Sequence, residues 1–363
     1  MTIRSITPIA LDLPFEVGGP KSQFAGRPRQ MAMLLVRVET EDGIVGWGDA
    51  FGYAVWPVTR AAIETLITPM AVGRNEDDID ALMSDLQRKL HIVGRTGPVV
   101  YALSGLDIAL WDIAGKKAGK PLSKMLGGSS RTHVPAYASL VRYDNSELVA
   151  RNAKAAVARG FKAIKLHETS VAHVKTAREA VGPDIKLMMD TNCPWTADEA
   201  ISIAEQVREY DLMWLEEPVF PPEDFTALAR VRRTGGVAIA AGENAMSPTD
   251  FRAMFDARAV DFAQPSVTKI GGISEMMRIA RLARERNVTL VPHSPYFGPG
   301  LLATVHMATA FECETMVEYS FVELGASPLG DAIDIIDGRL KVPTGPGLGR
   351  DPDPAIIARY TVT

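Results

Sequence analysis

The chain has few cysteines, no block of basic residues and no long hydrophobic segment. Its 363 residues include two cysteines, Cys193 and Cys313, which lie far apart in the sequence, so a disulfide framework is not expected. No stretch of about 18 consecutive apolar residues occurs, and the first residues, MTIRSITPIALDLPF, lack the basic segment and apolar run of a signal peptide. We therefore expect a cytoplasmic protein without a membrane partner.

The net charge is -5, and the basic residues form neither a run nor a stripe. Proteins that bind DNA or RNA usually carry a basic surface, so a nucleic-acid partner is not expected. Small-molecule chemistry is the more consistent function. The chain is 47% hydrophobic, which is enough to bury a large core, and its length favours more than one domain.

The first 125 residues predict an α+β domain. Residues 33–50, MLLVRVETEDGIVGWGDA, contain an apolar strand, a turn signal and a second strand, which is typical of an antiparallel hairpin. Residues 57–70, 76–91 and 98–118 carry apolar side chains at helical spacing. Gly119 and Pro121 are expected to end the last of these helices.

A regular alternation of strands and helices begins at about residue 134. Amphipathic segments of helix length separate eight apolar strands, VPAYAS, FKAIKLH, IKLMMD, LMWLE, VAIAAGE, VDFAQPS, VTLVPH and TMVEY. Eight such strands can close a barrel. We therefore predict an α/β fold with a first domain over residues 1–125 and a barrel over residues 126–335. Residues 336–363 are expected to return to the first domain.

Three of the predicted strands end in an acidic residue. Asp190 closes KLMMD, Glu216 closes LMWLE and Glu243 closes VAIAAGE. Because the strand ends of such a barrel open on one face, the three carboxylates predict a divalent metal site. Glu217 follows Glu216 directly, and neighbouring side chains of a strand face opposite sides, so the sequence does not choose between the two. Asn192 is expected to point the same way as Asp190.

Two candidate acid/base groups close the second strand of the barrel. Lys165 and His167 stand two apart in IKLHE, so they share one face of the strand and are expected to look into the barrel mouth. An imidazole titrates closer to neutrality than an ammonium, which makes His167 a candidate general base.

These motifs resemble those of the enolase superfamily, in its mandelate racemase-like branch. The resemblance rests on the strand ends DTN, EEP and GEN, the segment KIGG at 269–272, His293, and the segment LSGLDIALWDIAGKKAGKPLSKMLGG of the first domain. It covers essentially the whole chain. It implies an N-terminal α+β capping domain followed by a modified TIM barrel, (β/α)7β. It also implies a homo-oligomer and a Mg²⁺ ion bound by Asp190, Glu216 and Glu243.

The resemblance implies roles for the acid/base candidates as well. The family pattern at the second strand is Lys-x-Lys, in which the first lysine steadies the substrate carboxylate. Lys165 holds the first place here, and His167 replaces the second lysine. His293 matches a histidine that takes or donates a proton. In the racemase-like pattern an aspartate orients that histidine, but Ser266 stands in its place, so the Asp-His dyad is absent.

Three further residues are candidates for binding the substrate. Glu318, at the end of the eighth strand, matches a family acid that hydrogen-bonds the substrate carboxylate. Asn192 and Lys269 are the other two. Specificity is expected from residues 15–28 and 51–56 and from Tyr296 and Phe297, and Arg27 or Arg29 is a candidate for holding a distal carboxylate.

The chemistry that the resemblance implies is Mg²⁺-dependent abstraction of the proton alpha to the carboxylate of a small molecule. We predict dehydration of an acid sugar, an aldonate or aldarate, to a 2-keto-3-deoxy acid, with His167 or Lys165 as base and His293 as acid. Three alternatives stay open: racemisation or epimerisation of a 2-hydroxy acid, cycloisomerisation of a lactone, and a metal-binding barrel without catalysis.

Overall fold

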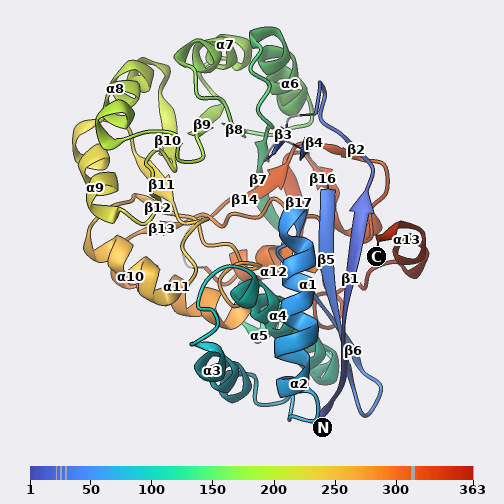
Figure 1. Ribbon diagram of the computed structural model, residues 1–363. Helices are drawn as coiled ribbons and strands as arrows, with labels where there is room; N and C mark the ends of the chain where they lie inside the picture. The colour runs from blue at the N-terminus through green and yellow to red at the C-terminus, as the bar shows by residue number, and fades with distance from the viewer. Residues whose placement is uncertain (22, 25–26, 29–30, 312–314, 363) are drawn as a thin grey trace.

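The computed structural model describes residues 1–21, 23–24, 27–28, 31–311 and 315–362. A β/α barrel makes up most of the chain, and a smaller α+β domain packs against one side of it (Figure 1). The C-terminal residues lie beside the first strand of the smaller domain.

The N-terminal domain is built on an antiparallel sheet with strand order β18-β1-β5-β6. Its strands are β1 (Ile3–Leu13), β5 (Met31–Thr40), β6 (Val45–Ala50) and β18 (Thr361–Val362). Its helices are α1 (Trp56–Ala62), the π-helical turn η2 (Ile63–Ile67), α2 (Thr68–Ala71), α3 (Ile79–Leu90), α4 (Pro98–Ala118) and α5 (Leu122–Met125). This is the predicted α+β capping domain.

Helix α4 is the core helix of the capping domain. A Cβ atom on Gly48 of β6 would lie 1.9 Å from the carbonyl oxygen of Gly105 in α4, so only glycine permits this close approach of strand and helix. By length and composition the helix could cross a membrane, but 83% of its most apolar 18-residue stretch is buried inside the fold. Its hydropathy therefore reflects its place in the core.

The barrel strands are parallel and follow the chain order, and β14 pairs with β7. They are β7 (His133–Ser139), β8 (Ala163–Leu166), β9 (Lys186–Asp190), β10 (Leu212–Glu216), β11 (Ile239–Ala241), β12 (Phe262–Ala263), β13 (Thr289–Leu290) and β14 (Val317–Ser320). All eight predicted strands are present, although most are shorter than the apolar segments that predict them.

A helix follows each of the first seven barrel strands and lies on the outside of the barrel (Figure 1). These helices are α6 (Ser146–Ala158), α7 (Val171–Val181), α8 (Ala197–Val207), α9 (Phe225–Thr234), α10 (Pro248–Asp256), α11 (Ile273–Glu285) and α12 (Pro299–Ala308). The order of elements confirms the predicted (β/α)7β barrel.

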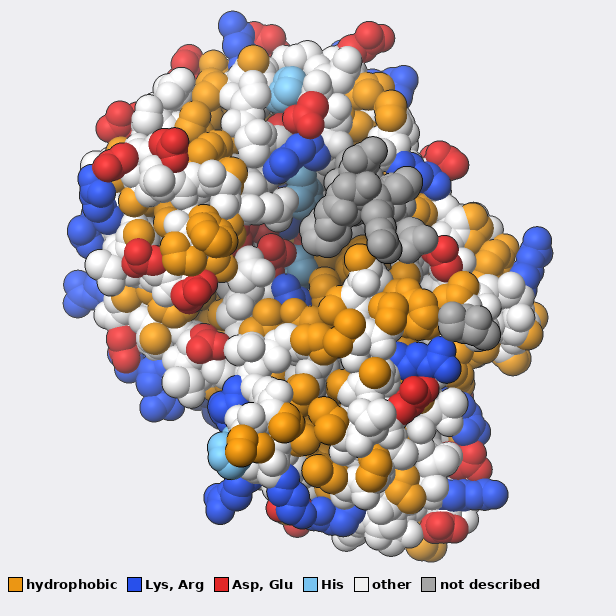
Figure 2. All heavy atoms as spheres, in the orientation of Figure 1, with side chains coloured by type: hydrophobic (Ala, Val, Ile, Leu, Met, Phe, Trp, Pro, Cys, Tyr) orange, Lys and Arg blue, Asp and Glu red, His pale blue; other side chains and the backbone are white. Residues whose placement is uncertain are grey.

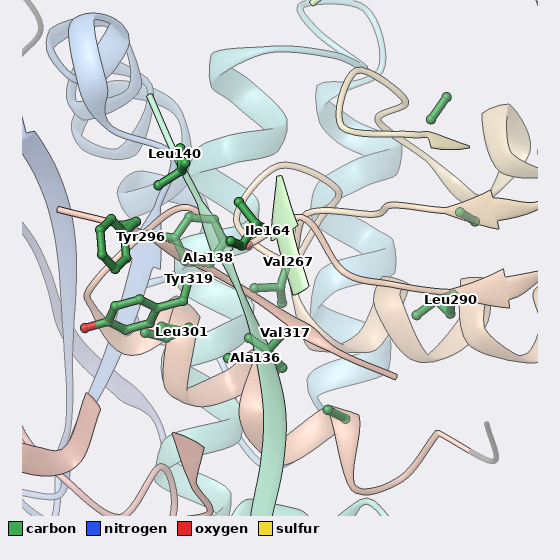
Figure 3. Packing of buried hydrophobic residues seen from close by; sticks show 14 of the residues in the cluster. Ala136, Ala138, Leu140, Ile164, Val267, Leu290, Tyr296, Leu301, Val317 and Tyr319 are labelled. Carbon is green, nitrogen blue, oxygen red and sulfur yellow. The ribbon is translucent and has the colours of Figure 1, made fainter. Parts of the chain in front are cut away.

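Two apolar layers hold the barrel together. Outward-facing side chains of the strands, such as Ile164, Val317 and Tyr319, pack against the surrounding helices, as the cluster around Leu301 of α12 shows (Figure 3). Inside the barrel, Tyr137, Ala163, Met188, Trp214, Ala240 and Val291 form a second buried cluster. The interior is therefore filled with side chains, and chemistry is confined to the carboxyl ends of the strands.

The barrel seam lies between β13 and β14. No backbone pairing joins these two strands in the part of the chain that the structure describes. Side chains bridge them instead, since Thr315 Oγ1 donates to the Leu290 carbonyl at 2.7 Å and Ser294 Oγ donates to the Glu318 carbonyl at 2.9 Å.

The last segment of the chain touches both domains. Strand β17 (Arg339–Lys341) pairs with β7 of the barrel and with β16 (Ile335–Ile336). Leu348 N then donates to Asp112 in α4, and β18 pairs with β1 after helix α13 (Pro354–Tyr360). The remaining short elements are β2 (Phe15–Glu16), β3 (Gln23–Phe24), β4 (Arg27–Pro28), η1 (Tyr53–Val55), η3 (Arg208–Tyr210), β15 (Glu323–Leu324) and η4 (Gly330–Ile333).

Carboxylates of the capping domain fix two barrel helices. Asp107 of α4 accepts hydrogen bonds from the backbone nitrogen of Ser274, at 3.1 Å, and from its hydroxyl, at 2.6 Å, at the start of α11. Asp49 of β6 accepts one from Gly300 N, at 3.3 Å, at the start of α12. The loops that precede these helices, after β12 and β13, are thereby held against the capping domain.

Candidate active site

Lys165 lies at the centre of a buried charge cluster in the barrel mouth. Its Nζ is 3.0 Å from Asp190 Oδ2, 2.6 Å from Glu216 Oε1 and 3.0 Å from Glu318 Oε1. All four side chains are buried. The three hydrogens of the ammonium group are therefore matched by three carboxylates.

The sheet register explains why these groups meet. Glu216 is directly opposite Asp190 in the pairing of β10 with β9, and Lys165 stands opposite Met188 on the next strand. Two neutral side chains hold the second oxygen of Glu216, since Trp214 Nε1 donates to Oε2 at 2.8 Å and Gln264 Nε2 at 2.7 Å.

The cluster carries more negative than positive charge. Burial and the charge of Asp190 raise the pKa of Glu216 well above its usual range. Burial also opposes ionisation of Asp190, but Lys165 and His167 outweigh it and hold the pKa of Asp190 well below its usual value. One lysine does not neutralise three carboxylates, and a further cation would relieve the repulsion between Asp190 and Glu216.

His167 has a partner at each ring nitrogen. Its Nδ1 lies against the Leu140 carbonyl oxygen, and its Nε2 is 3.1 Å from Asp190 Oδ2. Arg142 holds the same residue from behind, because its Nε donates to the His167 carbonyl at 2.5 Å and its Nη2 to the Thr191 carbonyl at 3.4 Å. The loop after β7 thus fixes the ring with Nε2 toward the site.

His293 and Glu243 face this cluster from the other side. His293 Nε2 is 2.7 Å from Glu243 Oε2 and 4.0 Å from Glu318 Oε2. Its Nδ1 is buried and has no hydrogen-bond partner among the described residues. Burial opposes ionisation of Glu243, but His293 and then Lys269 lower its pKa to about 2. Among the described residues, the hydrogen-bond and ion-pair partners of Glu243 are His293 and Asn244.

Glu318 is fixed by two serines that sequence reasoning missed. Ser139 Oγ donates to Glu318 Oε1 at 2.7 Å, and Ser294 N donates to Oε2 at 3.0 Å. Ser139 ends β7, and a polar residue at the end of an apolar strand is the signal that could have found it. The same signal applies to Gln264, which follows β12.

Ser266 does not orient the ring of His293. Its hydroxyl lies 3.1 Å from the Tyr296 hydroxyl, which in turn donates to the His293 carbonyl at 2.8 Å. Ser266 therefore supports the backbone of His293 through Tyr296. Phe297 is fully buried and packs against Tyr319, so it belongs to the core and not to the wall of the site.

Glu217 departs from the expected alternation of strand side chains. The strand ends at Glu216, and Glu217 has a positive φ of 44°, so its side chain also stays buried at the barrel mouth. It accepts hydrogen bonds from Gly242 N, at 2.9 Å, and from Cys193 Sγ, at 3.4 Å. Burial and the nearby charge of Glu243 raise the pKa of Glu217 to about 7. Of the two neighbouring glutamates, Glu216 is the one that contacts Lys165.

Asn192 faces the site, as its spacing from Asp190 predicts. Its φ is 55°, and its Nδ2 donates to Asp190 Oδ1 at 3.0 Å.

Lys269 has surroundings very different from those of Lys165. Its side chain is 6% exposed, and no acidic oxygen lies within 4.0 Å of its Nζ among the described residues. The ammonium lies 5.0 Å from the centroid of the Phe51 ring. Burial lowers the pKa of Lys269, and the more distant charges of Glu243 and Glu217 oppose this effect. Phe51 packs against the rings of Tyr53 and Tyr101, so the capping domain forms an aromatic wall here.

A further acidic group lies on the rim. Ligand atoms of Asp144, Glu168 and His173 lie within 4.8 Å of one another. Both oxygens of Glu168 are already engaged by the backbone nitrogens of Tyr143, at 2.7 Å, and Asp144, at 3.2 Å. This group therefore fixes the loop that contains Arg142.

The mouth of the barrel is an open hollow. Figure 2 shows acidic, basic and histidine side chains together in it, with hydrophobic side chains along its capping-domain side. Arg29 and the side chain of Arg27, the candidates for a distal carboxylate, lie outside the described residues, as does Cys313.

The residues at the mouth fit a hard divalent cation. The available donors are carboxylate oxygens, which Mg²⁺ prefers, and Asp190 and Glu216 are side by side on neighbouring strands. The excess of negative charge in the cluster points the same way. Asp190, Glu216 and Glu243 are the residues that would hold the ion.

Comparisons with known proteins agree with this fold and chemistry. Residues 148–356 match the model of the enolase C-terminal domain-like family, and residues 20–127 match the mandelate racemase / muconate lactonizing enzyme N-terminal domain. The D-galactarolactone cycloisomerase of Agrobacterium fabrum is 33% identical over 93% of this chain and 92% of its own length. The arabinonate dehydratase of Saccharolobus solfataricus is 33% identical over 88% of each chain.

One of the similar solved structures contains a bound metal ion. The structure of a racemase from Streptomyces coelicolor A3(2) with bound magnesium has a TM-score of 0.88 and 27% identity, and the match covers 99% of this chain and 100% of the racemase. The chain therefore belongs to the mandelate racemase / muconate lactonizing enzyme family of the enolase superfamily.

Proposed function

We propose that this protein is a Mg²⁺-dependent acid-sugar dehydratase with His167 as the base and His293 as the acid. The observation that carries the proposal is that the Nδ1 atoms of the two histidines are held differently. A backbone carbonyl lies against Nδ1 of His167, whereas Nδ1 of His293 has no partner among the described residues. Nε2 of each ring lies beside a carboxylate, Asp190 for His167 and Glu243 for His293.

We infer the tautomers of the neutral rings from these contacts. His167 carries its proton at Nδ1, against the Leu140 carbonyl, and leaves Nε2 able to accept a proton. His293 carries its proton at Nε2, beside Glu243, and can donate it. A two-base racemase also pairs one acceptor with one donor in each turnover, so we favour dehydration over racemisation on the dehydratases among the similar proteins, such as the arabinonate dehydratase. The serine at 266 supports this assignment, because an aspartate there would favour His293 as a base.

The reaction then divides among the residues of the chain. Asp190, Glu216 and Glu243 would hold Mg²⁺, which when bound would supply positive charge beside the substrate carboxylate on which negative charge develops. His167 Nε2 takes the C2 proton, and the electron pair left on C2 forms a C2=C3 bond as the C3–O bond breaks. His293 Nε2 gives its proton to the departing hydroxyl, which leaves as water. The enol product becomes a 2-keto-3-deoxy acid.

The other site residues bind and orient the substrate. Lys165 is proposed to steady the substrate carboxylate through its positive charge, and since its hydrogens are matched by three carboxylates we do not assign it as the base. Glu318, Asn192 and Lys269 are proposed to bind the substrate. We also keep the homo-oligomer and the cytoplasmic location as proposals, which rest on the family resemblance and the sequence.

Cycloisomerisation is the second candidate, because the A. fabrum cycloisomerase matches nearly the whole chain. The same base and acid would serve it, with a ring oxygen as the leaving group and no loss of water.

The test is a screen of sugar acids and their lactones with Mg²⁺ in D₂O, followed by NMR and mass spectrometry. We expect a product lighter by one water; an isomeric product of equal mass would establish the cycloisomerase, and inversion at C2 the racemase. The decisive variants are His167→Asn and His293→Asn. His293→Asn should still exchange the C2 proton but lose elimination by a factor of about 10² to 10⁴, whereas His167→Asn should lose both. Equal loss of exchange in both variants would contradict these roles.

A further inference from the structure

We propose that Lys269 binds a second carboxylate of the substrate, so that the preferred substrate is a sugar diacid and not a monoacid. This inference rests on the proposed function, since it names the substrate class of the same site.

The first step is that Lys269 lacks a partner. Its side chain is only 6% exposed, yet no ion pair or hydrogen bond joins its ammonium to any described residue. Burying an ammonium without an acceptor is costly. Lys165, which is fully buried, is matched by three carboxylates. Of the two, Lys269 therefore retains hydrogens for a ligand.

The second step is the position of the two lysines. Lys165 belongs to β8, the second barrel strand, and Lys269 to the loop after β12, the sixth strand. In a barrel of eight strands these elements stand on opposite sides of the mouth. A substrate whose first carboxylate lies beside Lys165 and whose C2 lies beside His167 extends across the mouth toward Lys269.

The third step is the nature of the contact. The Phe51 ring holds the ammonium from the capping-domain side, and the rings of Tyr53 and Tyr101 fix Phe51 in turn. Aromatic faces favour a cation there without taking up its hydrogen bonds. A carboxylate, which carries a full charge, suits an ammonium better than a hydroxyl does.

Arg142 is the other cation at the barrel mouth that we considered for binding a second carboxylate. It is a cation on the rim with no acidic partner within 4.0 Å among the described residues, but its guanidinium already donates to two backbone carbonyls beside His167. We therefore assign it as a positioning residue for His167, which should affect all substrates alike.

The test compares a hexaric acid with the hexonic acid of the same configuration at C2 to C5, which differ only at C6. We expect kcat/KM of the wild type to favour the diacid. Lys269→Met should lower kcat/KM for the diacid about 10- to 100-fold and change that for the monoacid much less. Lys269→Arg should retain part of the preference, and Arg142→Gln should lower both rates by the same factor.

The same comparison can be made without turnover, so that a wrong reaction does not hide a correct subsite. In the His167→Asn background with Mg²⁺, calorimetric titration should show tighter binding of the diacid, and the added Lys269→Met change should remove that difference. Equal effects of Lys269→Met on the two acids, in rates and in binding, would overturn the inference. So would a wild-type preference for the monoacid. Circular dichroism of each variant checks that the fold is kept.

Discussion

Both oxygens of Glu216, one of the three proposed metal ligands, are engaged by neighbouring side chains. Lys165 occupies one of its oxygens, and Trp214 and Gln264 occupy the other. Neutral donors that fix a carboxylate in place favour metal binding, because the ligand does not have to be immobilised when the ion binds. Glu217, its neighbour in the sequence, is instead tied to Gly242 and Cys193.

These different partners predict different effects of the same substitution. Glu216→Gln removes a carboxylate that would bind Mg²⁺ and should weaken Mg²⁺ binding by roughly 10- to 100-fold or more. Glu217→Gln preserves the acceptor for Gly242 N and should change the Mg²⁺ affinity by a much smaller factor. Calorimetric titration of both variants with Mg²⁺ measures the difference. Similar losses in the two variants would show that Glu217 also takes part in the metal site.

At the scale of single residues, the sequence predicted positions better than partners. The strand-end rule placed Asp190, Glu216, Lys165 and His167 at one mouth, because strand spacing alone determines it. The alternation rule did not apply to Glu217, since the strand ends one residue earlier and the backbone turns to a positive φ. No local pattern could show that Ser266 bonds Tyr296 or that Lys269 lacks an acid, because both depend on contacts between distant segments.

At the scale of elements, the capping domain supplies hydrogen-bond acceptors at the N-termini of two barrel helices that have no capping side chain of their own. The residues that precede α11 and α12 are Gly272 and Gly298, and neither has a side chain that caps the helix. Asp107 and Asp49 provide carboxylates at these ends. An anion at a helix N-terminus is favourable. The helices and strands themselves followed from periodicity, but these caps did not, because the acids are far away in the sequence.

The buried position of Asp49 predicts a pH dependence of stability. Burial raises its pKa from 3.8 to about 7, and the hydrogen bond from Gly300 opposes this only in part. Between these values the folded protein keeps a proton that the unfolded chain has lost, so the free energy of unfolding falls as the pH rises toward 7. Asp49→Asn removes this contribution.

Chemical unfolding of the wild type and of Asp49→Asn at pH 5 and pH 8 measures the effect. The stability of the wild type relative to the variant should fall by on the order of 2 to 3 kcal/mol between the two pH values. Other buried acids titrate in both proteins, so the comparison isolates Asp49. Parallel stability profiles would show that its carboxyl group does not gain affinity for its proton on folding.

At the scale of the whole molecule, the site is shared between the two domains. The barrel contributes the carboxylates and histidines, and the capping domain contributes the aromatic wall and the contacts that hold the loops after β12 and β13. The last strand of the chain, β18, closes the arrangement by pairing with β1. The family resemblance predicted that a capping domain and a barrel form the site together. Composition and periodicity alone predicted only an α+β domain and a β/α barrel.

The excess of carboxylates in the barrel mouth predicts that Mg²⁺ stabilises the entire fold. An ion that binds only the folded protein adds RT ln(1 + [L]/Kd), about 2.7 kcal/mol when its concentration is 100 times Kd, which corresponds to a rise in Tm on the order of 5 °C. Thermal unfolding in a chelator, and again after Mg²⁺ is restored, measures this shift. The chelated protein should remain folded at room temperature, because both apolar cores are complete without the ion. Glu216→Gln, measured at the same Mg²⁺ concentration, should show a smaller rise. An equal rise in the wild type and in this variant would place the stabilising ion at a different site, and no rise in the wild type would contradict binding itself.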